Sequence, residues 1–68
     1  MVIFYMNKNA QSIGDHRVHR EGCTWMPYSD NRLFLGDFPS CHDAVKKAKE
    51  HDPEADGCIF CSNECHTR

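Results

Sequence analysis

Two short-spaced pairs of histidine and cysteine constrain the fold of this chain more than any other feature. Three residues separate His19 from Cys23 in HREGC, and two residues separate Cys58 from Cys61 in CIFC. Structural zinc sites are tetrahedral, use Cys and His, and commonly take their ligands from two such pairs. The spacing therefore predicts one Zn²⁺ site in which His19, Cys23, Cys58 and Cys61 tie the two ends of the chain together.

The small size of the chain explains why its fold needs a stabilising cross-link of this kind. It has 68 residues, of which 40% are hydrophobic, so we expect a single small domain (residues 1–68) with a thin core. Domains of this size are marginal unless disulfides, a metal or oligomerisation stabilise them. Apparent zinc-binding free energies of ~10–16 kcal/mol exceed what such a core supplies. The size thus favours a zinc-stabilised domain.

The cysteine count leaves three interpretations open, namely metal ligands, disulfides or free thiols. The chain has five cysteines, so a closed set of disulfides would leave one thiol over. MVIFYM is too short for the apolar region of a signal peptide, and no apolar run approaches the length of a membrane span. We therefore expect a reduced, cytoplasmic, metal-binding protein without a membrane segment.

The pattern outside the ligand pairs predicts strands. VIFYMN (2–7) is aromatic and β-branched, and HRVHR (16–20) fits the return strand of a hairpin after a turn over 8–15. In that return strand, Val18 is expected to face the core while Arg17 and His19 point the other way. RLFLGDF, from Arg32 to Phe38, predicts a further strand whose glycine forms a bulge or turn.

The clearest predicted element is a helix over Ser40–His51. Ser40 suits the N-cap, and Asp43 suits a capping box in the place of the usual Glu. Residues at helical spacing form one apolar stripe: Cys41, Ala44, Val45 and Ala48. Asp52 precedes a proline, which ends the helix, and EADG (54–57) predicts a turn. Cys41 is therefore interpreted as a core thiol rather than a ligand.

The remaining cysteine and histidines have no assigned role. Cys65 and His66 fit extra ligands, neighbours of the site or a frayed tail. His16, His42 and His51 lack a partner at ligand spacing, so we expect them to be solvated.

Three motifs follow one another along most of the chain, from about Val2 to Cys61. They are VHREGC (18–23), FPSCHDAV (38–45) and GCIFC (57–61). Their order resembles the Ada-type metal-binding domain, which is also appended to some bacterial nucleases and lipoproteins. The resemblance implies a small α+β fold with a β-hairpin or short antiparallel sheet, one helix and a C-terminal C-x2-C knuckle. Its ligand positions match the four residues predicted above.

The same resemblance also bears on activity. In the Ada repair protein, the first cysteine of the C-x3-C pair accepts a methyl group from DNA. His19 stands at that position, so methyl transfer is not expected. The chain also lacks H-E-x-x-H, P-loop and G-x-S-x-G motifs, and its many sulfur ligands favour a closed site. We therefore expect no enzymatic activity.

Two kinds of partner remain open. A protein-interaction or regulatory module of otherwise unknown role is the favoured interpretation, with a protein as the partner. The alternative is a module that binds single-stranded or duplex nucleic acid through three arginines and neighbouring aromatic residues: Arg17, Arg20 and Arg32 with Trp25, Tyr28 and Phe34. The net charge of −2 counts against nucleic acid, and these aromatics could instead fill the core.

Overall fold

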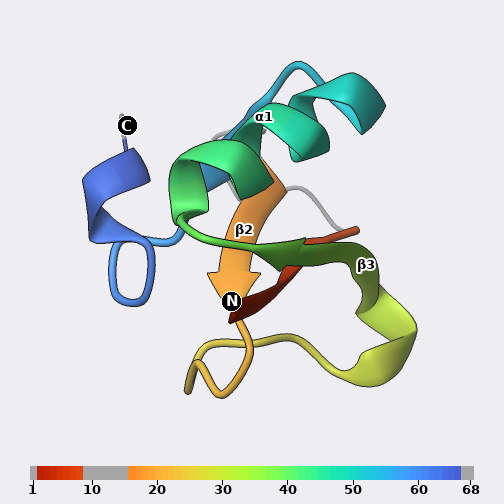
Figure 1. Cartoon of the computed structure of the whole chain (residues 1–68). Helices are drawn as coiled ribbons and strands as arrows, with labels where there is room; N and C mark the ends of the chain where they lie inside the picture. The colour runs from red at the N-terminus through yellow and green to blue at the C-terminus, as the bar shows by residue number, and fades with distance from the viewer. Residues whose placement is uncertain (1, 9–15, 67–68) are drawn as a thin grey trace.

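The computed structural model describes residues 2–8 and 16–66, and all but the first residue of the turn predicted over 8–15 lie outside this part (Figure 1). The described elements are, in chain order, β1 (Val2–Asn7), β2 (His16–Arg20), the 3₁₀ turn η1 (Ser29–Asn31), β3 (Arg32–Phe38), α1 (Cys41–His51), β4 (Ala55–Gly57) and the 3₁₀ turn η2 (Asn63–Cys65). The four strands form one mixed sheet in the order β3-β1-β2-β4, and α1 packs against it. The structure thus confirms the predicted α+β class.

The middle of the sheet contains the predicted hairpin. β1 pairs antiparallel with β2, where Met6 lies opposite Val18, and antiparallel with β3 on its other side. The register against β3 shifts between Phe4 and Tyr5, opposite Gly36. Gly36 has a φ of +131°, which residues with a side chain rarely adopt. The bulge predicted at this glycine is confirmed.

β4 corrects the sequence prediction, which assigns EADG to a turn. Ala55–Gly57 forms a short strand that pairs in parallel with β2, with Asp56 opposite Arg17. Asp and Gly are rare in strands, so the residues themselves carry no strand signal. The strand forms because the chain returns from α1 to the edge of β2, whose backbone groups pair with those of residues 55–57.

The core lies between the sheet and α1. Its buried hydrophobic residues come from every strand, from α1 and from η2: Phe4, Met6, Val18, Leu35, Cys41, Ala44, Ala48, Ala55 and Cys65. Val18 is fully buried, as predicted. The predicted stripe of the helix is also confirmed, with Val45 only partly buried at its edge.

α1 begins where the sequence predicts, but the predicted capping interactions differ. Ser40 has the extended backbone of an N-cap, yet its side chain makes no capping hydrogen bond within the described residues. The predicted capping box with Asp43 is therefore absent. An Asp side chain is one methylene shorter than the Glu that normally reaches back to the N-cap.

Among the described helices, none has the length and hydrophobicity that crossing a membrane requires.

Candidate metal centre

The structure brings the four predicted ligands together. His19, Cys23, Cys58 and Cys61 each offer one donor atom, and these atoms all lie within 4.8 Å of one another. The Sγ atoms of Cys23 and Cys58 are 4.0 Å apart, and Nδ1 of His19 is 3.9 Å from Sγ of Cys61. A tetrahedral ion with Zn–S bonds of about 2.3 Å separates its sulfur ligands by roughly 3.8 Å. The Cys₃His cluster could therefore hold a metal ion.

A tight turn places the first pair. The backbone N–H of Cys23 donates to the carbonyl oxygen of Arg20 at 3.0 Å, so the chain reverses directly after β2. Gly22, the third residue of this turn, has a φ of +90°, a value that favours glycine. The reversal returns Cys23 to the side of His19, the second-last residue of β2.

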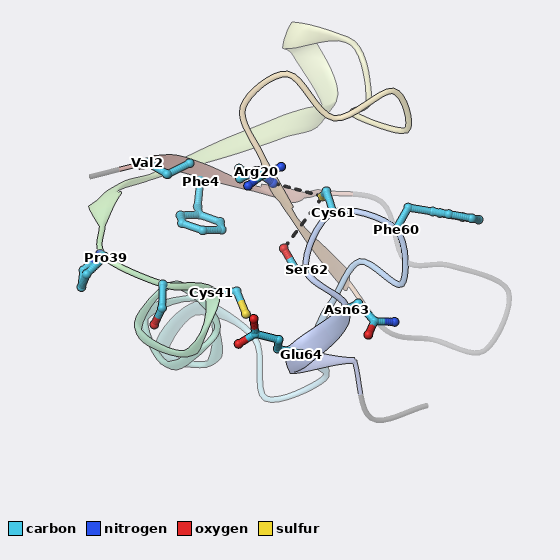
Figure 2. A pocket seen from close by; sticks show the side chains of 11 residues that line it. Val2, Phe4, Arg20, Pro39, Cys41, Phe60, Cys61, Ser62, Asn63 and Glu64 are labelled. Carbon is cyan, nitrogen blue, oxygen red and sulfur yellow. Dashed lines mark hydrogen bonds between the residues drawn. The ribbon is translucent and has the colours of Figure 1, made fainter.

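β2 also positions the second pair. The backbone N–H of Cys58 donates to the carbonyl oxygen of Val18 at 2.9 Å, which extends the pairing of β4 by one residue. The backbone N–H of Arg20 donates to Sγ of Cys61 at 3.3 Å (dashed in Figure 2). The N–H of Ser62 then closes the loop by donating to the carbonyl oxygen of Cys58 at 2.9 Å. One strand therefore contacts both halves of the cluster.

Gly57 is needed here for space rather than for flexibility. The φ of Gly57 is not positive, so its backbone conformation does not call for a glycine. A Cβ at this position would lie 2.7 Å from the carbonyl oxygen of Ser62 and 2.8 Å from Cβ of Cys65. The segment that follows the C-x2-C pair thus packs directly onto the Gly57 backbone, and this contact folds the knuckle back on β4.

His19 is in the state that a metal ligand requires. Its side chain is buried, with 3% of its surface exposed, although it lies on the face of β2 opposite the core residue Val18. Burial lowers the pKa of His19, and the charge of Arg17 lowers it further, so the imidazole is neutral. Nε2 of His19 is buried without a hydrogen-bond partner among the described residues. A metal ion could supply a partner for a ring nitrogen of this buried imidazole.

For Cys61, in contrast, burial favours the protonated form of the side chain. Burial raises the pKa of its thiol, and the neighbouring Cys23 adds to this increase, while the N–H of Arg20 opposes it. Without a cation the thiol therefore retains its proton. A metal ion reverses this preference because it binds the thiolate.

The other two cysteines correct the sequence prediction. Cys41 and Cys65 form a disulfide that links the first residue of α1 to the last residue of η2, and Figure 1 shows these two segments side by side. The sequence predicts that Cys41 is a free core thiol and leaves Cys65 without a partner. The burial of Cys41 is confirmed, but its free state is wrong. Helical spacing identifies the buried face of α1, but it carries no information about the segment that packs there.

His16 also differs from its prediction, and His66, whose role the sequence left open, has a defined contact. His16 is not solvated, because Nε2 lies 2.8 Å from the carboxylate of Asp52 and Nδ1 lies 2.9 Å from the carbonyl oxygen of Asn7. His66 lies outside the Cys₃His cluster, with Nδ1 at 2.6 Å from the guanidinium of Arg17. These contacts join residues that are distant in the sequence, so spacing did not reveal them. His42 and His51 are exposed, as predicted.

The aromatic residues considered for nucleic-acid binding are on the surface. The exposed fractions of Trp25, Tyr28 and Phe34 are 60%, 85% and 60%, so the suggestion that they fill the core is wrong. Trp25 stacks on Phe60 of the knuckle, which is also exposed, with ring centroids 5.1 Å apart. Phe34 instead packs edge-on against Tyr5, on the open face of the sheet. The Cys₃His cluster therefore has an exposed aromatic pair directly beside it.

Two of the three arginines considered for nucleic-acid binding contact other residues of the chain. Arg17 lies 3.7 Å from the carboxylate of the buried Asp56 and donates to the carbonyl oxygen of Gly57 at 3.2 Å. The guanidinium of Arg32 lies over the ring of Tyr5 at 5.0 Å. Arg20 is exposed at the end of β2.

Comparisons of the chain with protein-family models, curated proteins and solved structures find no match. The resemblance to the Ada-type domain therefore rests on the three sequence motifs alone. What the structure establishes is a small α+β domain with a Cys₃His cluster that could hold a metal ion.

Proposed function

We propose that this protein is a small module built around a structural Zn²⁺, with a role in binding rather than catalysis. The observation that carries the proposal is the convergence of four donor atoms within 4.8 Å from two distant segments. Three thiolates and one neutral imidazole are a soft donor set, which Zn²⁺ suits better than the oxygen-seeking Mg²⁺ or Ca²⁺. Four protein ligands complete a tetrahedron and leave no position for a water nucleophile.

Elemental analysis of protein purified without added metal tests this proposal. We expect about one zinc per chain, and we expect a strong chelator to remove both the metal and the folded state, because binding and folding are coupled in such sites. A protein that stays folded and takes up no zinc after chelation would overturn the proposal.

The surface beside the cluster supports a protein as the binding partner. Trp25, Ile59 and Phe60 are 60%, 47% and 67% exposed. Together with Arg17, His19 and Cys58 they line a cavity of about 230 Å³. Large apolar side chains gathered on the surface of a small domain commonly mark a protein interface. The proposed zinc fixes this surface, because Ile59 and Phe60 lie between the ligands Cys58 and Cys61.

Single-stranded nucleic acid is the second candidate, and the exposure of Trp25 favours it. An exposed ring can stack on a base, and Arg20 supplies a charge at the end of the neighbouring strand. The net charge of −2 and the pairing of Arg17 with Asp56 oppose this candidate.

Tryptophan fluorescence separates the two candidates, because Trp25 is the only tryptophan. If a protein is the partner, a single-stranded oligonucleotide at low salt leaves the emission unchanged. Quenching that salt reverses would establish the nucleic-acid alternative. An Arg20→Ala variant provides the control, because it should weaken quenching only if a phosphate contacts this arginine.

A further inference from the structure

A second group of metal-binding side chains lies outside the Cys₃His cluster. Cys41, His42 and Cys65 each offer a donor atom, and these three atoms lie within 4.8 Å of one another. The sulfurs of Cys41 and Cys65 are joined as a disulfide. His42, the next residue of α1, is exposed, so its imidazole has room to turn.

The surroundings of this group provide space for a cation. A cavity of about 200 Å³ adjoins it, lined by residues of α1, β4 and η2: His42, Val45, Lys49, Asp56, Glu64 and Cys65. In this lining the carboxylate of Glu64 balances the ammonium group of Lys49, while the carboxylate of Asp56 lies 3.7 Å from the guanidinium of Arg17. A water molecule in the cavity could complete a tetrahedron around an ion held by three protein donors.

We propose that Cys41, His42 and Cys65 form a second site for Zn²⁺, which is available only when the disulfide is reduced. A dithiol supplies two electrons and two protons to the disulfide, which becomes two thiols, while the dithiol becomes a disulfide. Each thiol then loses its proton as its sulfur binds the ion, and His42 contributes a neutral ring nitrogen. The disulfide and the metal are thus alternative states of the same two sulfurs.

Both states hold the same elements together. The disulfide joins η2 to the first turn of α1, and an ion bound by Cys41 and Cys65 would join them in the same place. A change in redox conditions would therefore alter the metal content of the protein without unfolding it. The second site does not depend on the zinc proposed for the Cys₃His cluster, which uses the three cysteines that are free in the structure.

Metal stoichiometry in the two redox states tests the proposal. One sample keeps its disulfide, and the other is reduced with excess dithiothreitol and freed of it by anaerobic gel filtration. Both are then given excess Zn²⁺, desalted and analysed for zinc. We expect about one zinc per chain in the oxidised protein and about two in the reduced protein. Equal zinc content in the two samples would overturn the proposal.

Matched histidine variants make the assignment specific. His42→Ala and His51→Ala both remove an exposed histidine from α1, but only His42 belongs to the group. In the reduced state, His42→Ala should weaken the second zinc by at least about tenfold, because a metal site loses one of three protein ligands. His51→Ala should bind as the unaltered protein does. Equal affinity in the two variants would refute the role of His42.

A cysteine variant distinguishes this proposal from the first. Cys41→Ala with Cys65→Ala should bind about one zinc per chain under both redox conditions, since only the Cys₃His cluster remains. A second zinc in this reduced variant would show that other residues hold it and would contradict the proposal. An oxidised wild-type protein without any zinc would instead contradict the structural zinc, while the comparison of redox states would still report on the second site.

Discussion

The Sγ atoms of Cys23 and Cys58 lie 4.0 Å apart although 35 positions separate the two residues in the chain. Between them lie β3, α1 and β4, so a metal bound by both sulfurs would close a loop that contains most of the fold. The link joins the turn after β2 to the knuckle after β4, and these strands are neighbours in the sheet. The site and the parallel pairing of β2 with β4 therefore support each other.

Removal of one sulfur ligand should unfold the domain. Cys58→Ser leaves three donors and places an oxygen where the ion requires a thiolate, so we expect loss of zinc and a loss of stability of several kcal/mol. Ile59→Ala in the same knuckle is the control, because its side chain is half-exposed and offers no ligand. Zinc content and the dispersion of amide NMR signals measure both effects. A folded Cys58→Ser variant with full zinc content would exclude Cys58 as a ligand.

Gly57→Ala should destabilise the knuckle by steric overlap. The new methyl group would meet the backbone oxygen of Ser62 at 2.7 Å, and a backbone atom cannot rotate away as a side chain can. We expect a loss of about 1–3 kcal/mol in chemical denaturation of the zinc-saturated protein, as for other overpacked sites. Gly22→Ala tests a different cause, because a Cβ there meets nothing within 4 Å and only its φ of +90° is unfavourable. A Gly57→Ala protein as stable as the wild type would show that Ser62 moves freely.

Metal affinity should fall as the pH falls. Burial raises the pKa of Cys61, so its proton must be displaced when the ion binds, and binding tightens as the pH rises. Burial lowers the pKa of His19, so this ligand is already neutral and contributes little to the pH dependence near neutrality. Competition with a coloured chelator between about pH 6 and about pH 8 measures the slope. A pH-independent affinity would indicate that thiols do not bind the ion.

His16→Ala should weaken the link between β2 and the end of α1. The His16 ring contacts the carboxylate of Asp52 at 2.8 Å and the carbonyl oxygen of Asn7 at 2.9 Å. Both partners are partly exposed, so we expect a loss of only about 0.5–1.5 kcal/mol in thermal or chemical unfolding. His51→Ala, an exposed site on α1, should change the stability by less than about 0.5 kcal/mol. Equal effects of the two substitutions would show that the His16 contacts contribute nothing.

Elements with a strong local pattern are predictable from this sequence. The aromatic and β-branched residues of VIFYMN form β1, and the stripe of α1 from Cys41 to Ala48 repeats at helical spacing. Both patterns reflect the geometry of a single element and require no knowledge of its neighbours. β4 has no such pattern. Its Ala, Asp and Gly form a strand because they pair with the edge of β2.

The sequence by itself determined which residues can form a metal site, because the spacing of each pair is a local property of a turn. His19 with Cys23 and Cys58 with Cys61 are each brought together by the short segment between them. Only the tertiary structure decided which sulfurs stay free and which form a bond. Cys65 reaches Cys41 because the chain folds back over Gly57, where the absence of a side chain permits close contact with the Cys65 backbone. Such a contact depends on the arrangement of β4, η2 and α1 in space, which no spacing along the chain specifies.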